Sequence, residues 1–131
     1  MTAIKESSTN QENRQYMLDN CPVTYTLEKI GGRWKPHILY NLRNGTLRYG
    51  QLRKAIPIIT EKMLVQHLRE LEADGLVIRE TRPVVPPHVE YSLSPLGKSL
   101  TPLLNEMASW GEKNNPGMKM ENDPAIKMEM A

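Results

Sequence analysis

Lys62, Gln66 and Arg69 are the residues whose types and spacing point most directly to chemistry with another molecule. At about 100° per residue in a helix, they fall on one face, and three leucines fall on the opposite face. These leucines are Leu64, Leu68 and Leu71. A glutamine amide can bond an adenine edge at two points, and long cations can bond guanine or phosphate. The pattern predicts a helix with a buried leucine face and a free face suited to DNA. Because glutamates lie nearby, an ordinary charged helix surface is the alternative.

The residues at the two ends of this segment predict where the helix begins and ends. Thr60 is suited to cap the first turn, and Gly75 stands where a glycine commonly ends a helix. Base contacts of such helices concentrate near the N-terminus. This tendency favours Thr60, Lys62 and Met63 over Arg69 as DNA-contacting residues.

The stretch "GGRWKPHIL" at residues 31–39 allows two interpretations. A phosphate-binding loop of an enzyme would follow a strand and continue with further glycines or with Lys-Ser/Thr. The preceding segment looks helical and no such pattern follows, so a corner between two helices is favoured. Arg33 and Lys35 then lie near a helix N-terminus, where they could contact a phosphate group or simply be solvated. Trp34 is expected to be a core residue and not a base-stacking one.

Further cations surround a proline-rich stretch that is expected to form the tip of a hairpin. Arg79, Arg82 and His88 flank this tip, and Arg82 is the strongest candidate for contact with a DNA backbone or minor groove. Prolines restrict the unbound tip, so less freedom is lost on docking. Arg48 and Arg53 are additional phosphate candidates. Each of these cations could instead be an ordinary solvated charge.

Cys21 is the single cysteine of the chain. It precedes Pro22 at an expected helix start, where the helix dipole favours a thiolate, although an inert buried thiol is the commoner fate of a lone cysteine. The three histidines lie on different elements without ligand-like spacing, so no metal site and no cofactor are expected. No acid–base pair or nucleophilic triad can be assembled, and the chain is not expected to be an enzyme.

The length of 131 residues and the net charge of +2 fit one domain with a mild basic bias. Residues 1–20 are polar and are expected to form a flexible arm, residues 21–114 the folded domain, and residues 115–131 a flexible methionine-rich tail. No apolar run is long enough for a membrane span or a signal region. The sequence therefore predicts a cytoplasmic protein.

The periodicity between the two tails predicts an α+β, mainly helical fold. Short helices are expected over 22–30, from Pro36 to about residue 43, and over 50–55, with the helix at 60–74 following them. Two strands at 76–82 and 89–93 form a hairpin, and one longer helix begins at Pro95. A three-helix core with a two-stranded hairpin beside it is the winged helix-turn-helix arrangement.

Several long motifs stand in the order found in one family of bacterial regulators. They read "CPV", "IGGRWKPHIL", "RYGQLRKAIP", "ITEKMLVQHLRELEADGLVIR", "VPPHVEYSLSPLGKSL" and "WG". On these motifs the chain resembles the HxlR-type winged helix-turn-helix regulators, relatives of the MarR-type group. Pro36 and the acid-free tip "RPVVPP" depart from the commoner pattern.

This resemblance implies a homodimer that binds a two-fold symmetric operator on double-stranded DNA. Residues from Thr60 to Asp74 would be the recognition helix and Arg82 to His88 the wing. The N-terminal and last helices would form the dimer interface. Its expected residues are Val23, Leu27, Leu100, Leu104, Met107 and Trp110, although each would also suit an intrachain core. Some members use the cysteine matching Cys21 to sense quinones, aldehydes or oxidants. A module that binds an acidic protein partner through the same basic face is the alternative function.

Overall fold

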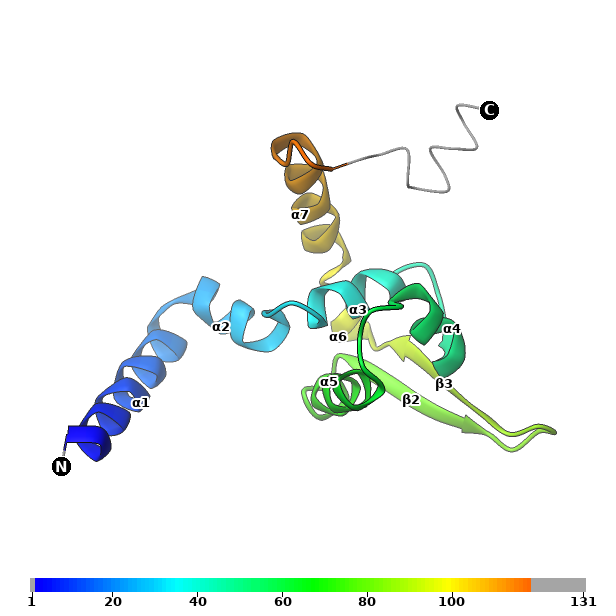
Figure 1. Cartoon of the computed structure of the whole chain (residues 1–131), viewed down its shortest axis with the longest axis horizontal. Helices are drawn as coiled ribbons and strands as arrows, with labels where there is room; N and C mark the ends of the chain where they lie inside the picture. The colour runs from blue at the N-terminus through cyan, green and yellow to red at the C-terminus, as the bar shows by residue number, and fades with distance from the viewer. Residues whose placement is uncertain (1, 119–131) are drawn as a thin grey trace.

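The computed structural model describes residues 2–118 of the chain (Figure 1). The helices are α1 (Thr2–Asn20), α2 (Pro22–Ile30), α3 (Lys35–Leu42), α4 (Tyr49–Ala55), α5 (Glu61–Ala73), α6 (Pro95–Lys98) and α7 (Thr101–Asn114). The strands are β1 (Leu47–Arg48), β2 (Val77–Arg82) and β3 (His88–Leu93). The mainly helical α+β fold with a hairpin beside it is therefore confirmed.

Helices α3, α4 and α5 pack around an aliphatic core that the sheet closes on one side. Each helix contributes the leucines that its periodicity predicts, including Leu39, Leu52 and Leu68, which are at most 1% exposed. Burying a leucine side chain contributes about 1.5–3 kcal/mol, so these faces hold the three helices together. Trp34 is half-buried against this core, as expected of a packing residue.

The sheet has three antiparallel strands in the order β1-β3-β2, where the sequence predicts a two-stranded hairpin. The additional strand is the short link at Leu47–Arg48, which pairs with Tyr91 and Glu90 of β3. A free hairpin edge leaves backbone groups unpaired, and β1 satisfies part of that edge. This pairing also fixes the start of α4 beside the hairpin.

The last helix is broken, contrary to the single longer helix expected from Pro95. Ser94 caps α6, because its hydroxyl accepts a hydrogen bond from the Gly97 N–H at 2.9 Å. Helix α6 ends at Lys98, four residues before Pro102. A proline has no N–H and its ring clashes with the carbonyl four residues earlier, so Pro102 fits the first turn of α7 and cannot continue α6.

The N-terminal segment forms helix α1, whereas the sequence predicts a flexible arm at residues 1–20. The segment has neither glycine nor proline, so nothing in it interrupts a helix. Figure 1 shows α1 projecting from the body of the molecule beyond α2. An ion pair between Arg14 and Glu28 joins the two helices.

At the other end, only residues 115–118 of the tail expected at 115–131 belong to the part that the structure describes. Within residues 2–118, no helix is both long enough and apolar enough to cross a bilayer.

Candidate nucleic-acid interface

Helix α5 is anchored through its leucines and open on its opposite side. Thr60 caps the first turn as predicted, because its Oγ1 accepts a hydrogen bond from the Met63 N–H at 3.2 Å. Leu64, Leu68 and Leu71 are buried as predicted. Since these leucines fix the rotation of the helix about its axis, the residues on the opposite face must face solvent.

The expected base-contacting residues all lie on this open side. Lys62, Gln66 and Arg69 are exposed, and so is Thr60 at the start of the helix. Met63 is 38% exposed. The structure thus brings together, on one accessible helix face, an amide, two cations and a flexible apolar side chain, which are groups that can contact base edges and phosphates.

A groove of about 940 Å³ runs between α5, the start of α4 and the sheet. Four cations line it from four elements, and a single carboxylate, Glu72, also lines it. These cations are Arg48, Lys54, Arg69 and Arg79. In the part of the chain that the structure describes, none of the four forms an ion pair. The groove is therefore a positively charged concave surface next to the exposed face of α5.

Of these cations, Lys54 was not named from sequence, and Arg79 was named only as one of the cations flanking the hairpin tip. Arg79 faces the groove because it lies two residues from the buried Val77, on the same side of β2. That alternation was visible in the sequence and could have separated Arg79 from Arg82. Lys54 lies on a short helix whose rotation only the packing of Leu52 fixes, and no local signal identified it.

The other side of the hairpin carries a cluster of paired charges. Arg82 Nε lies 3.0 Å from Glu90 Oε2, and its Nη2 lies 3.0 Å from Glu80 Oε2. His88 also borders the groove, but its Nε2 lies 3.0 Å from Glu90 Oε1. Hydrogen bonds from His88 and Arg82 lower the pKa of Glu90. The two predicted wing residues are thus already partnered within the hairpin.

The remaining three candidate cations differ in how free they are. Arg33 is exposed, as a phosphate contact requires. Lys35 is instead tied within the domain, since its side chain is 14% exposed and its Nζ lies 2.7 Å from Glu70 Oε2. Arg53 is half-buried beside Tyr49. Lys35 is therefore poorly placed for the phosphate contact that the sequence suggested.

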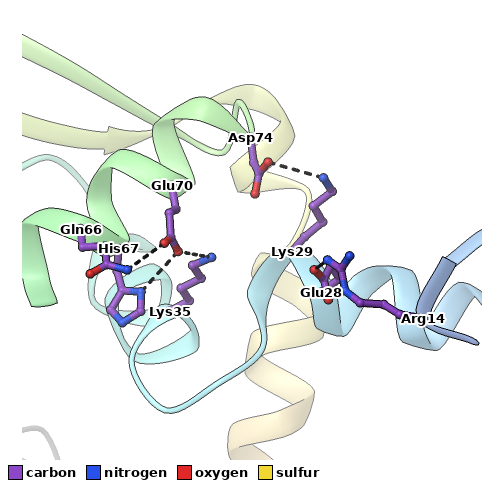
Figure 2. Close-up of polar contacts among 8 residues, drawn as sticks. All are labelled: Arg14, Glu28, Lys29, Lys35, Gln66, His67, Glu70 and Asp74. Carbon is purple, nitrogen blue, oxygen red and sulfur yellow. Dashed lines mark hydrogen bonds and ion pairs between the residues drawn. The ribbon is translucent and has the colours of Figure 1, made fainter. Parts of the chain in front are cut away.

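The two glycines of "GGRWK" explain where Lys35 ends up. A side chain at Gly31 would place its Cβ 2.1 Å from the Leu27 carbonyl oxygen, and Gly32 adopts a φ of +90°. Only glycine fits both conditions readily. The resulting corner between α2 and α3 brings the first residue of α3 against α5, as Figure 2 shows for Lys35 and Glu70.

Helices α2 and α7 both lie away from the hairpin (Figure 1), and each carries exposed apolar residues. Val23 and Leu27 of α2 are 67% and 54% exposed, and Met107 and Trp110 of α7 are 43% and 70% exposed. Large exposed apolar side chains of this kind commonly mark a protein interface when they form a patch. The other two expected interface residues behave differently, because Leu104 is buried in the core and Leu100 packs against it.

Cys21 is half-buried at the start of α2. The nearby Thr24 hydroxyl, together with the backbone amides of Thr24 and Val23, lowers the pKa of the thiol. A lower pKa raises the fraction of nucleophilic thiolate at neutral pH.

Comparison with known proteins decides the family. Residues 29–119 match the HxlR-like helix-turn-helix family. The chain belongs to this family. The helix-turn-helix-type transcriptional regulator YybR of Bacillus subtilis is 48% identical over 96 residues, which is 73% of this chain and 77% of that protein. These relatives are transcriptional regulators and not enzymes. Membership of a helix-turn-helix regulator family implies DNA binding.

Two solved structures of regulators have a similar fold. The redox regulator HypR in its oxidized form has a TM-score of 0.69 and 48% identity, covering 72% of this chain and 98% of that chain. The reduced form of the transcriptional regulator YodB from Bacillus subtilis has a TM-score of 0.64 and 31% identity, covering 76% and 98%. Helix α1 lies outside the residues that match the HxlR-like family.

Proposed function

We propose that this HxlR-like regulator binds a two-fold symmetric operator as a homodimer. In this proposal α5 enters the major groove of DNA, and Thr60, Lys62, Met63 and Gln66 contact base edges there. The hairpin of β2 and β3 lies on the backbone and the adjacent minor groove. The observation that carries the proposal is the open, leucine-anchored face of α5 beside a groove of unpaired cations.

The groove between α5 and the hairpin suits one phosphate strand. When a helix reads the major groove and a wing reaches the minor groove, the backbone between the two grooves must pass between helix and wing. Arg48, Lys54, Arg69 and Arg79 line that passage and would neutralise its phosphates. Arg33 would add an outlying contact, whereas Lys35 and Arg82 are already engaged with carboxylates.

Homodimer formation would bury the exposed apolar residues of α2 and α7. Two recognition helices related by a two-fold axis can enter successive major grooves about 34 Å apart, so the half-sites should lie about one helical turn apart. A regulator acting on chromosomal DNA in this way would work in the cytoplasm.

Selection of bound duplexes from a random DNA pool tests the proposal. The expected result is a palindromic sequence whose half-sites lie about one helical turn apart. Lys62→Ala combined with Gln66→Ala should abolish that preference while leaving weak, salt-sensitive binding. Binding of all duplexes with equal affinity would instead favour the alternative of a protein-interaction module, which an acidic protein partner would then have to engage.

A second candidate function concerns regulation through Cys21. The lowered pKa and partial exposure of its thiol favour reaction with an electrophile. With a quinone, the thiolate would form a sulfur–carbon bond and the quinone oxygen would take up a proton, so no additional reductant is needed. Quinone treatment should then weaken operator binding by the natural protein and leave Cys21→Ser unaffected. Equal loss in both proteins would exclude Cys21 as the sensor.

A further inference from the structure

Glu70 forms a small polar cluster that connects the corner before α3 to the exposed face of α5 (Figure 2). Its Oε2 lies 2.7 Å from Lys35 Nζ and 3.6 Å from His67 Nδ1. Its Oε1 accepts a hydrogen bond from Gln66 Nε2 at 3.2 Å. The side chain of Lys35 is 14% exposed and that of His67 is 19% exposed. The carboxylate is therefore held from below by the largely buried Lys35, lies near His67 and reaches outward to Gln66.

The chemistry of Glu70 determines which way the Gln66 amide must face. Hydrogen bonds from Lys35 and Gln66 lower the pKa of Glu70, so the group is a carboxylate at neutral pH. A carboxylate only accepts hydrogen bonds, so the NH₂ end of the amide must face it. Figure 2 shows the Gln66 oxygen on the side away from Glu70. Gln66 thus presents one acceptor and one remaining N–H to an incoming ligand.

That arrangement fits adenine better than guanine. In the major groove adenine offers N7 as an acceptor and its N6 amino group as a donor, which fit one N–H and one oxygen of an amide. Guanine offers two acceptors, N7 and O6. To bond both, Gln66 would have to donate both Nε2 hydrogens, and one of them is already bound to Glu70.

We infer that Glu70 is a positioning residue that presets Gln66 to read adenine in preference to guanine, with Lys35 holding the Glu70 carboxylate in place. The inference rests on the proposed function, since it requires α5 to lie in the major groove. In this arrangement Lys35 of the "GGRWK" corner acts on Gln66 of α5 through the Glu70 carboxylate. When a side chain already holds its bound conformation, less conformational entropy is lost on binding, and the selectivity between bases increases.

The test measures the affinity ratio for two duplexes that differ only at the base pair read by Gln66. Duplex selection is carried out with the natural protein and with Gln66→Ala. The base pair read by Gln66 is the position at which the natural protein shows a base preference and Gln66→Ala does not. The natural protein should prefer adenine to guanine there by on the order of tenfold, the size of a good bidentate contact. Selection of any other base at this position would overturn the inference.

Glu70→Gln should reduce this ratio to about one or below. The single oxygen of the new amide would be taken by Lys35, so its NH₂ end would face Gln66 and turn that amide round. Lys35→Met leaves the Gln66 bond in place but frees the carboxylate, so the ratio should fall by a smaller factor. Thermal melting followed by circular dichroism confirms that both variants are folded.

Glu72→Gln is the matched control, because it removes the same charge from the same helix without touching Gln66. The ratio should stay at its natural value in this variant, even if overall affinity rises. An unchanged ratio in Glu70→Gln, or an equal loss in Glu72→Gln, would overturn the inference while leaving operator binding intact. If the natural protein selects no sequence at all, the proposed function is wrong. The inferred role of Glu70 is then wrong as well.

Discussion

The two sides of this molecule expose opposite kinds of surface. Around α5 and the hairpin, unpaired cations line a concave groove. Around α2 and α7, large apolar side chains such as Trp110 and Leu27 stand more than half exposed. Charge without carboxylate partners suits a polyanion, whereas exposed apolar helices suit a second protein surface. One small domain thus carries two distinct kinds of surface.

The same contrast exists within the cations themselves. Arg79 and Arg82 lie three residues apart on one strand, yet Arg79 faces the groove and Arg82 lies between two glutamates. Arg33 and Lys35 lie two residues apart, yet one is exposed and the other is paired with Glu70. The number of positive charges in a segment therefore does not give the number available to DNA.

The largest expected effect comes from disrupting the apolar side. Leu27→Asp together with Trp110→Asp should convert the dimer into monomers, because each change places a charge in the proposed interface. Operator affinity should fall by about a hundredfold or more, since a monomer engages one half-site only. Sedimentation velocity measures the mass, and fluorescence anisotropy measures the affinity.

The control for this change is Val85→Asp, which alters a 99% exposed apolar residue at the hairpin tip. In sedimentation velocity, this variant should form the same oligomer as the natural protein. A natural protein that is monomeric at micromolar concentration, or a double variant that stays dimeric, would contradict the proposed interface.

The next effect compares the two arginines of β2. Arg79→Ala should weaken binding to all duplexes alike and reduce the slope of log affinity against log salt by about one, which corresponds to one lost phosphate contact. Arg82→Ala on the opposite side of the same strand should change the slope by clearly less. A titration of salt against affinity checks both, and an equal slope change for the two variants would remove the distinction between the two sides of the hairpin.

A smaller effect separates Lys35 from Arg33. Lys35→Ala should lower the free energy of unfolding by about 1 kcal/mol, since the partner carboxylate is partly exposed and the ion pair is screened. Its salt slope should stay close to the natural one. Arg33→Ala should do the reverse, with natural stability and a reduced slope. Urea unfolding measures the stability of both variants, and salt titrations measure their slopes. Equal changes in stability and in slope for the two variants would contradict the distinction between Lys35 and Arg33.

The smallest effect concerns pH. The pKa of Glu70 is lowered from its ordinary value of 4.5, chiefly by the hydrogen bond from Lys35. The folded state therefore favours the carboxylate, so this contribution to stability is present above pH 4.5 and is lost as pH falls through the folded pKa. The stability difference between the natural protein and Glu70→Gln should be constant near neutral pH and shrink below pH 4.5. Urea unfolding at several pH values measures it, and a difference that grows in acid would contradict the assignment.

Local patterns were sufficient to predict helices α2 to α5, but not helix α1 or the break between α6 and α7. The leucine spacing of α5, the Thr60 cap and the corner at Gly31 each depend on a few neighbouring residues, and all are confirmed. Strand β1 could not be foreseen, because two residues gain their pairing only from a partner more than forty positions later in the chain. The break before α7 was visible in Pro102, but the apolar stripe across it suggested one helix.

The candidate site was predictable in its position but not in its electrostatics. The sequence indicates which helix is open, whereas the partners of each cation depend on packing between distant segments. Glu70 received no role from sequence, although the Gln66 spacing of four residues was a usable signal. The pairing with Lys35 joins residues thirty-five positions apart and required the corner to be built.

The most direct test of the central claim is the base preference of the open face of α5. Duplex selection with the natural protein should give a palindromic site, and Lys62→Ala with Gln66→Ala should erase its preference while retaining salt-sensitive binding. An unchanged preference in that double variant would show that the exposed face of α5 does not read DNA.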